Sequence, residues 1–118
     1  MIRALIADDH AVVRQGLKQI LGDTPEMVVA GEATNGQEVL DKVRAETWDV
    51  VVLDISMPDR SGLDVLKQLR SERPKLPVLV LSMHSEDQYA VRVLKAGASG
   101  YLTKDSAPDE LVKAIRKV

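Results

Sequence analysis

The chain has 118 residues, a formal net charge of -2 at neutral pH and no cysteine. A chain of this length can bury roughly two thirds of its unfolded surface in one core, so we expect a single domain over residues 1–118. The absence of cysteine excludes disulfides and thiol catalysis, and the absence of a dense Lys/Arg run argues against general attraction to nucleic acid or membranes. No long apolar span or signal-like start is present, which favours a cytoplasmic location.

Five short apolar segments alternate with five segments of helical periodicity. The expected strands span residues 2–7, 27–33, 50–53, 78–82 and 100–103, and the expected helices span 11–21, 36–46, 61–72, 86–96 and 107–118. The first and third strand candidates are short apolar runs bounded by polar residues, as in strands buried on both faces of a parallel sheet. The alternation predicts a doubly wound parallel α/β fold.

Most helix starts carry a capping signal, in which an acceptor precedes a polar residue by three positions. These pairs are Asn35 with Glu38, Ser61 with Asp64, Ser85 with Gln88 and Ser106 with Asp109. The last helix has apolar residues at Leu111, Val112, Ile115 and Val118, and this stripe is still in phase where the sequence stops. This pattern fits a boundary before a further module beyond Val118 at least as well as the natural end of a single-domain protein.

Aspartates follow two of the expected strands directly. Asp8 and Asp9 come after Ala-Leu-Ile-Ala, and Asp54 comes after Val-Val-Val-Leu. If these strands are neighbours, their carboxylates meet, and two of them 4 Å apart repel by roughly 4 kcal/mol at an effective dielectric constant near 20. Such a cluster needs a cation or a proton, and an all-oxygen site suits Mg2+. Taken singly, each aspartate could equally serve as a helix cap.

Hydroxyl and amino groups follow the later strands. Ser82 comes after Val-Leu-Val-Leu, and Lys104 comes after Gly-Tyr-Leu-Thr with Thr103 beside it. A carboxylate nucleophile, a hydroxyl donor and a lysine form a coherent set for phosphoryl transfer at the carboxyl edge of a parallel sheet. Considered without the acids, Ser82 could cap a turn and Lys104 could be an ordinary surface lysine.

Four sequence stretches together resemble a receiver domain of two-component response regulators, and the resemblance spans the whole chain. The stretches are ADDH, VVVLDISMPDRSGLDVL, VLVLS and AGASGYLTKD. The amino-acid sequence is similar to that of the NarL/FixJ-type subfamily. Members of this subfamily usually carry a C-terminal helix-turn-helix DNA-binding domain of LuxR type. The resemblance implies a flavodoxin-like (βα)5 fold with strand order 2-1-3-4-5.

The resemblance also assigns roles at the acidic site. It implies that Asp54 accepts a phosphoryl group from the phosphohistidine of a sensor histidine kinase. Mg2+ would be held by Asp8, Asp9, Asp54 and the backbone carbonyl of Ser56. The chain would then be no enzyme in its own right, although it takes part in its own phosphorylation and dephosphorylation.

The remaining implied roles concern the switch. Ser82 would follow the phosphoryl group inward, Lys104 would pair with it, and Tyr101 would change rotamer as Ser82 moves. We expect a homodimer on phosphorylation, no membrane contact, and DNA contact only through the missing C-terminal domain.

The chain departs from the family pattern after the lysine. Many members have a cis proline there, whereas Lys104 precedes Asp105, and a cis bond before a residue other than proline costs about 2.5 to 4 kcal/mol. In this family the positions of Ser56 and His84 tune hydrolysis of the aspartyl phosphate. We interpret His10 as a loop-packing residue, because an oxygen-only site suits Mg2+.

Two other functions remain open from the residues. One is an aspartate-nucleophile phosphohydrolase of the haloacid dehalogenase type, which also uses Mg2+ and a lysine but places a D-x-D pattern after the first strand. The other is a flavin carrier of the same fold, although the acidic pocket would repel a flavin phosphate and no Gly/Ser/Thr-rich loop follows the first strand. Multiple turnover would identify the hydrolase, and a yellow protein would identify the flavin carrier.

Overall fold

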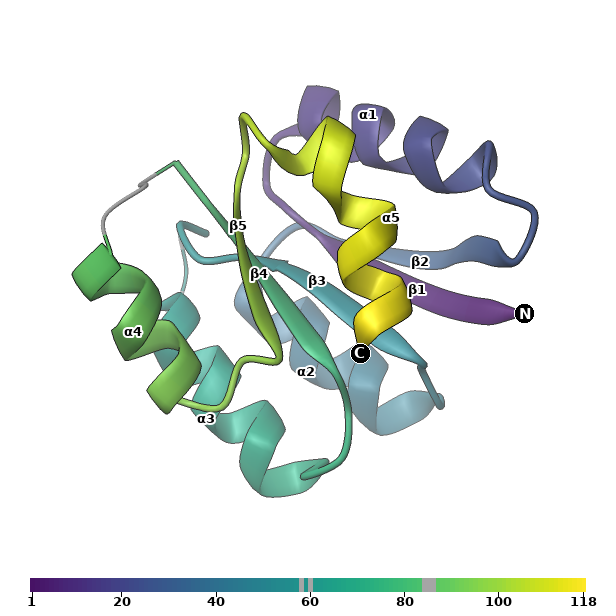
Figure 1. The fold of residues 1–118 in the computed structure, drawn as a ribbon. Coiled ribbons are helices and arrows are strands. Elements are labelled where there is room, and N and C mark those ends of the chain that lie inside the picture. The colour runs from purple at the N-terminus through teal and green to yellow at the C-terminus, as the bar shows by residue number, and fades with distance from the viewer. Residues whose placement is uncertain (58, 60, 84–86) are drawn as a thin grey trace.

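A five-stranded parallel sheet with helices on both faces forms the molecule, in a computed structural model that describes residues 1–57, 59, 61–83 and 87–118 (Figure 1). The elements are β1 (Ile2–Ala7), α1 (Ala11–Gly22), β2 (Met27–Ala33), α2 (Gly36–Ala45), β3 (Val50–Asp54), α3 (Gly62–Glu72), β4 (Val78–Ser82), α4 (Asp87–Lys95), β5 (Gly100–Thr103) and α5 (Ala107–Lys117). The strand order is β2-β1-β3-β4-β5 with parallel pairings throughout, which confirms the predicted flavodoxin-like fold.

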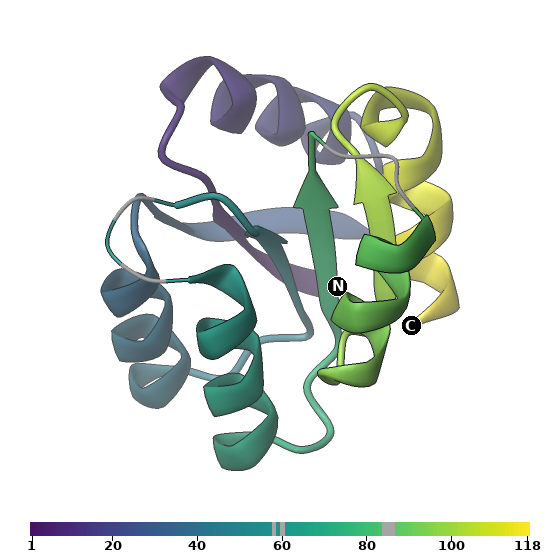
Figure 2. The same cartoon turned by 90° about the vertical axis from the view of Figure 1, so that its left-hand side faces the viewer.

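The helices divide between the two faces of the sheet. Figures 1 and 2 show α1 and α5 on one face, and α2, α3 and α4 on the other. Side chains along β1 alternate accordingly: Ala4 and Ile6 belong to the core under α1 and α5, whereas Leu5 and Ala7 belong to the core under the other three helices. Helices thus cover both faces of the sheet, whereas the carboxyl ends of the strands are available to form a binding site.

The middle of the sheet explains the continuous apolar runs in the sequence. Every residue of β3 and β4 is buried, including the polar residues Asp54 and Ser82 at their ends. The residues of edge strand β5 are only partly buried. Within the described ranges, none of the helices combines the length and the apolar character needed to cross a membrane.

One of the predicted helix caps is confirmed and two are wrong. The Asn35 side chain accepts a hydrogen bond from the Glu38 N–H at 2.9 Å, at the start of α2. The side chains of Ser61 and Ser106 form no capping hydrogen bond at the starts of α3 and α5. The cap expected at Ser85 lies outside the described residues.

A glycine permits a close approach between α3 and the loop that follows β3. The Gly62 N–H donates to the Ile55 carbonyl at 3.2 Å, and a Cβ on Gly62 would lie 2.5 Å from both the Cα and the carbonyl oxygen of Ile55. Because both neighbours are backbone atoms, the contact cannot be relieved by a rotamer change.

We expect Gly62→Ala to lower the free energy of unfolding by about 1–3 kcal/mol, since the added methyl group must displace the backbone of the loop. Urea denaturation measures this change. Gly16→Ala is the matched control, because a Cβ there meets nothing within 4 Å and alanine favours the helix by roughly 0.5–1 kcal/mol. Equal stability of the two variants would contradict the close approach.

Candidate functional site

The register of the sheet brings the aspartates together, as the sequence predicts. β1 and β3 are neighbours, and Ala7 pairs with Leu53, so the next residues, Asp8 and Asp54, leave the sheet side by side. Both aspartates are 0% exposed. Two carboxylates are therefore buried next to each other at the carboxyl edge of the sheet.

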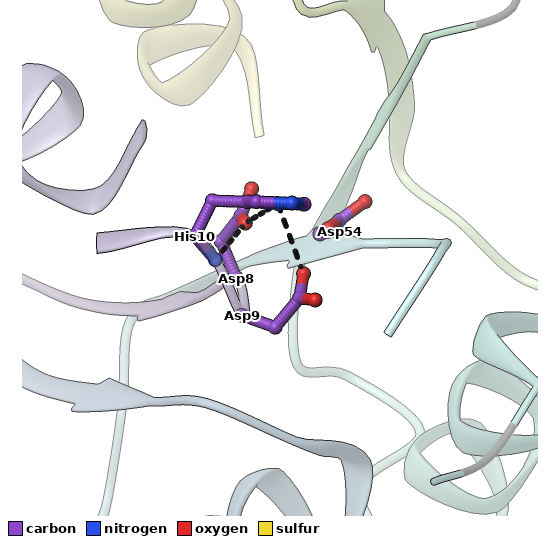
Figure 3. Close-up of side chains that lie close together, drawn as sticks. All are labelled: Asp8, Asp9, His10 and Asp54. Atoms are coloured by element: carbon purple, nitrogen blue, oxygen red, sulfur yellow. Dashed lines mark hydrogen bonds and ion pairs between the residues drawn. The ribbon is translucent and has the colours of Figure 1, made fainter. Parts of the chain in front are cut away.

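Asp9 and His10 complete a compact cluster with these two aspartates. One potential ligand atom from each of Asp8, Asp9, His10 and Asp54 lies within 4.8 Å of the others (Figure 3). His10 Nδ1 lies 3.2 Å from Asp8 Oδ1 and 3.1 Å from Asp9 Oδ1. The interpretation of His10 as a loop-packing residue is wrong, because its side chain is 65% exposed and faces the two carboxylates. Its position directly after Asp8-Asp9 was the signal that could have placed it in the cluster.

Lys104 supplies a positive charge between the buried carboxylates. Its Nζ lies 3.1 Å from Asp8 Oδ2 and 3.3 Å from Asp54 Oδ2, and its side chain is 13% exposed. Burial alone would lower the pKa of Lys104, but hydrogen bonding and the charges of Asp8 and Asp54 outweigh burial, so the pKa is raised. Lys104 therefore stays charged at neutral pH.

The environment of the Asp54 carboxyl shifts its pKa upward. Burial raises the pKa of the Asp54 carboxyl, the Ser56 N–H lowers it, the charge of Asp8 raises it, and Lys104 lowers it, with a net upward shift. The Ser56 N–H donates to Asp54 Oδ1 at 3.1 Å. Asp54 is thus a carboxylate that a further positive charge would help to ionise.

The other predicted site residues lie on the last two strands. Ser82 ends β4, is 0% exposed, and pairs with Thr103 of β5, while its carbonyl accepts from the Lys104 N–H at 2.8 Å. Tyr101 is partly buried on β5 and packs against the core under α2, α3 and α4. No cis peptide bond occurs in the described chain, so the bond after Lys104 is trans. His84 lies outside the described residues.

The donor set fits a hard divalent cation. Two carboxylate oxygens, Asp8 Oδ2 and Asp9 Oδ1, are buried and lack a hydrogen bond of good geometry among the described residues, although Lys104 Nζ and His10 Nδ1 each lie 3.1 Å from one of them. Carboxylate oxygens that the protein pairs only with nearby charged or ring nitrogens, in a cluster of three carboxylates, are a suitable environment for Mg2+. The carboxylates of Asp8, Asp9 and Asp54 could hold it.

The fold and the acidic edge together define the class of protein. Residues 4–116 match the response regulator receiver domain family, and the chain belongs to it. Members of this family are phosphorylation-controlled switches that partner with sensor kinases, and an aspartyl phosphate and Mg2+ are typical of them.

Curated relatives point to a subfamily of transcriptional regulators. The chain is 40% identical over 118 residues to the response regulator UvrY of Escherichia coli O6:H1, 41% identical to the response regulator GacA of Pseudomonas viridiflava, and 40% identical to the DNA-binding transcriptional activator DevR/DosR of Mycobacterium tuberculosis. Each match covers 100% of this chain but only 54% of UvrY and 55% of GacA. The chain thus spans about half the length of these relatives.

Solved structures agree with this assignment. A LuxR-family response regulator from Aurantimonas sp. superposes with a TM-score of 0.92 at 35% identity, covering 98% of this chain and 82% of that one. The signal receiver domain of the putative response regulator NarL from Mycobacterium tuberculosis gives 0.91 at 35% identity, covering 98% and 94%. Together with the curated relatives, these structures confirm the NarL/FixJ-type resemblance.

We expect Asp54→Asn to raise the free energy of unfolding at pH 7 by about 1–2 kcal/mol. Because the folded-state pKa of Asp54 lies above its ordinary value of 3.8, the ionised carboxyl destabilises the fold progressively as the pH rises through that folded-state pKa. The gain should therefore shrink at pH 4. Urea denaturation at both pH values measures it, with the exposed Asp105→Asn as control, and a gain of the same size at both pH values would contradict the buried-charge explanation.

Proposed function

We propose that this domain is the phosphoacceptor switch of a two-component system, and that Asp54 takes the phosphoryl group from the phosphohistidine of a sensor kinase. The observation that carries the proposal is the position of Lys104 Nζ, which lies within 3.3 Å of the buried carboxylates of Asp8 and Asp54. Capping aspartates need no such cation. A charged amino group at this point is suited to neutralise a phosphoryl group that arrives at Asp54.

The transfer step follows from this arrangement. An Asp54 carboxylate oxygen forms a bond to phosphorus while the phosphorus–nitrogen bond of the phosphohistidine breaks, and the released imidazole nitrogen keeps the electron pair and takes a proton from water. Lys104 offsets part of the upward pKa shift that burial causes at Asp54 and so favours its ionised, attacking form, and the Ser56 N–H fixes the direction of the carboxylate. Bound Mg2+ supplies further neutralisation of the phosphoryl charge, with Asp8, Asp9, Asp54 and the Ser56 carbonyl as its proposed ligands.

The modified domain would differ from the unmodified one in charge and in acceptor number. An aspartyl phosphate adds negative charge and further acceptor oxygens beside Lys104. The Ser82 hydroxyl, buried at the end of the neighbouring strand, would donate to one of these oxygens, and Tyr101 would turn as Ser82 moves. Water would later hydrolyse the acyl phosphate, at a rate that Ser56 and His84 tune.

The effect on transcription would come from a part of the protein outside this chain. UvrY and GacA are nearly twice as long as this chain, DevR/DosR is a DNA-binding transcriptional activator, and a similar regulator, RcsB of Salmonella, has been solved bound to the promoter rprA. These relatives support a C-terminal DNA-binding domain in the whole protein, for which we propose the helix-turn-helix type. A cytoplasmic location and dimerisation on phosphorylation are further parts of the proposal. The domain described would then control transcription without touching DNA itself.

We expect incubation with Mg2+ and a small acyl phosphate donor to add one phosphoryl group to the chain, as seen by intact mass. The gain in mass should vanish when Mg2+ is chelated, because the charge that neutralises the phosphoryl group is then missing. It should also vanish in Asp54→Asn, because the acceptor carboxylate is then missing. Steady consumption of the donor without a gain in mass would favour the phosphohydrolase instead. No reaction at all would favour the alternative interpretation, in which the aspartates serve only as helix caps.

We expect Lys104→Gln to slow this phosphorylation by about a hundredfold or more, the usual effect of removing one charge-stabilising group from a transfer site. The exposed Lys113→Gln on α5 is the matched control and should leave the rate unchanged. Rates come from the same mass measurement over time. Equal rates in both variants would mean that Lys104 only balances charge in the folded domain.

A further inference from the structure

One arginine of α1 holds both ends of the loop that carries the metal-site aspartates. The Arg14 N–H donates to the His10 carbonyl at 3.1 Å, within the first turn of α1. The Arg14 guanidinium reaches back over the loop, and its Nη1 donates to the Asp8 carbonyl at 2.7 Å. The loop is therefore closed at its first and last residues by the same side chain and backbone.

Glu32 of β2 orients this guanidinium. Arg14 Nε donates to Glu32 Oε1 at 3.1 Å, and Glu32 stands opposite Ile6 in the pairing of β1 with β2. The other Glu32 oxygen accepts from Lys18 Nζ at 3.1 Å, one turn further along α1. Hydrogen bonding to Lys18, and then to Arg14, lowers the pKa of Glu32 despite its partial burial, so the carboxylate is charged at neutral pH.

The Asp8 carbonyl belongs to the peptide that joins Asp8 to Asp9, so a hydrogen bond to this carbonyl fixes the plane from which Asp9 projects. Asp9 needs such support. Its side chain is 27% exposed, and the neighbour of its buried Oδ1 is the largely exposed His10 ring, whose Nδ1 lies 3.1 Å away without a hydrogen bond of good geometry. Asp8, in contrast, is held by its own side chain, whose Oδ1 accepts from the His10 N–H at 2.8 Å.

We propose that Arg14, aligned by Glu32, is a positioning residue that pre-organises the Asp8–Asp9 edge of the pocket for a hard divalent cation. The proposal rests on the proposed function, because it concerns the same Mg2+ site. The planar, two-pronged shape of the guanidinium (its fork) matters as well as its charge, because Nε donates to the Glu32 side chain while Nη1 donates to the Asp8 carbonyl. A lysine ammonium does not reproduce this planar geometry. Outer partners of this kind commonly change metal affinity by 10–100-fold.

The test is the Mg2+ dissociation constant, measured by titration calorimetry on wild type, Arg14→Lys, Arg14→Gln and Lys18→Gln. We expect both Arg14 variants to bind Mg2+ about tenfold more weakly or worse, with Lys preserving the charge but not the fork. Lys18→Gln is the matched control: it removes the other cation from Glu32 without touching the Asp8 carbonyl, and it should bind Mg2+ within twofold of wild type.

A second readout separates positioning from chemistry. In the acyl phosphate reaction, the Arg14 variants should need at least tenfold more Mg2+ for half-maximal rate but reach the wild-type rate at saturating Mg2+. Urea denaturation establishes that each variant is folded before titration.

Several outcomes would overturn the proposal. Wild-type Mg2+ affinity in either Arg14 variant would do so, as would an equal loss in Lys18→Gln, which would assign the effect to the charge around Glu32. A reduced rate that saturating Mg2+ fails to restore would also do so. If wild type binds no Mg2+, the proposed function fails with it, whereas a failure confined to the Arg14 variants leaves the proposed function intact.

Discussion

The burial of two like charges side by side is the constraint on which the site depends. Asp8 and Asp54 are both 0% exposed at the ends of adjacent strands, a placement that would be strongly unfavourable for two isolated carboxylates. Lys104 offsets part of this repulsion by lying within 3.3 Å of both, yet the pKa of Asp54 stays raised. Lys104 thus neutralises the negative charge of the pocket only in part. The remaining negative charge is a physical reason for cation binding at this site.

The fold sustains this unfavourable arrangement because the two faces of the sheet are firmly packed. β3 is buried along its whole length, between a core shared with α1 and α5 and a core shared with α2, α3 and α4. The favourable free energy of burying these aliphatic side chains offsets the cost of the charges at the strand ends. Stability and function are therefore spatially separated: the apolar layers hold the strands, and the carboxyl edge holds the acids.

The sequence predicts the strands to within one residue because buried parallel strands are apolar runs with sharp polar ends. It also predicts the meeting of Asp8 with Asp54, since carboxyl ends of neighbouring parallel strands share an edge. A competing local hydrogen bond explains why one helix-cap prediction is wrong. Ser106 was expected to cap α5, but its Oγ donates to the Thr103 carbonyl at 3.1 Å instead. The contact between Arg14 and Glu32 depends on pairing between β1 and β2, so no local pattern could reveal it.

The geometry also indicates how a change at Asp54 would reach the edge of the sheet. The Lys104 ammonium contacts Asp54, while its backbone N–H donates to the Ser82 carbonyl, next to the last paired residues of β4 and β5. A phosphoryl group on Asp54 would attract the ammonium and the Ser82 hydroxyl toward the same point. Because β5 is an edge strand and only partly buried, it opposes such a shift less than the fully buried β3 would. The proposed signal therefore starts at a fully buried strand and is expressed at a partly buried edge strand.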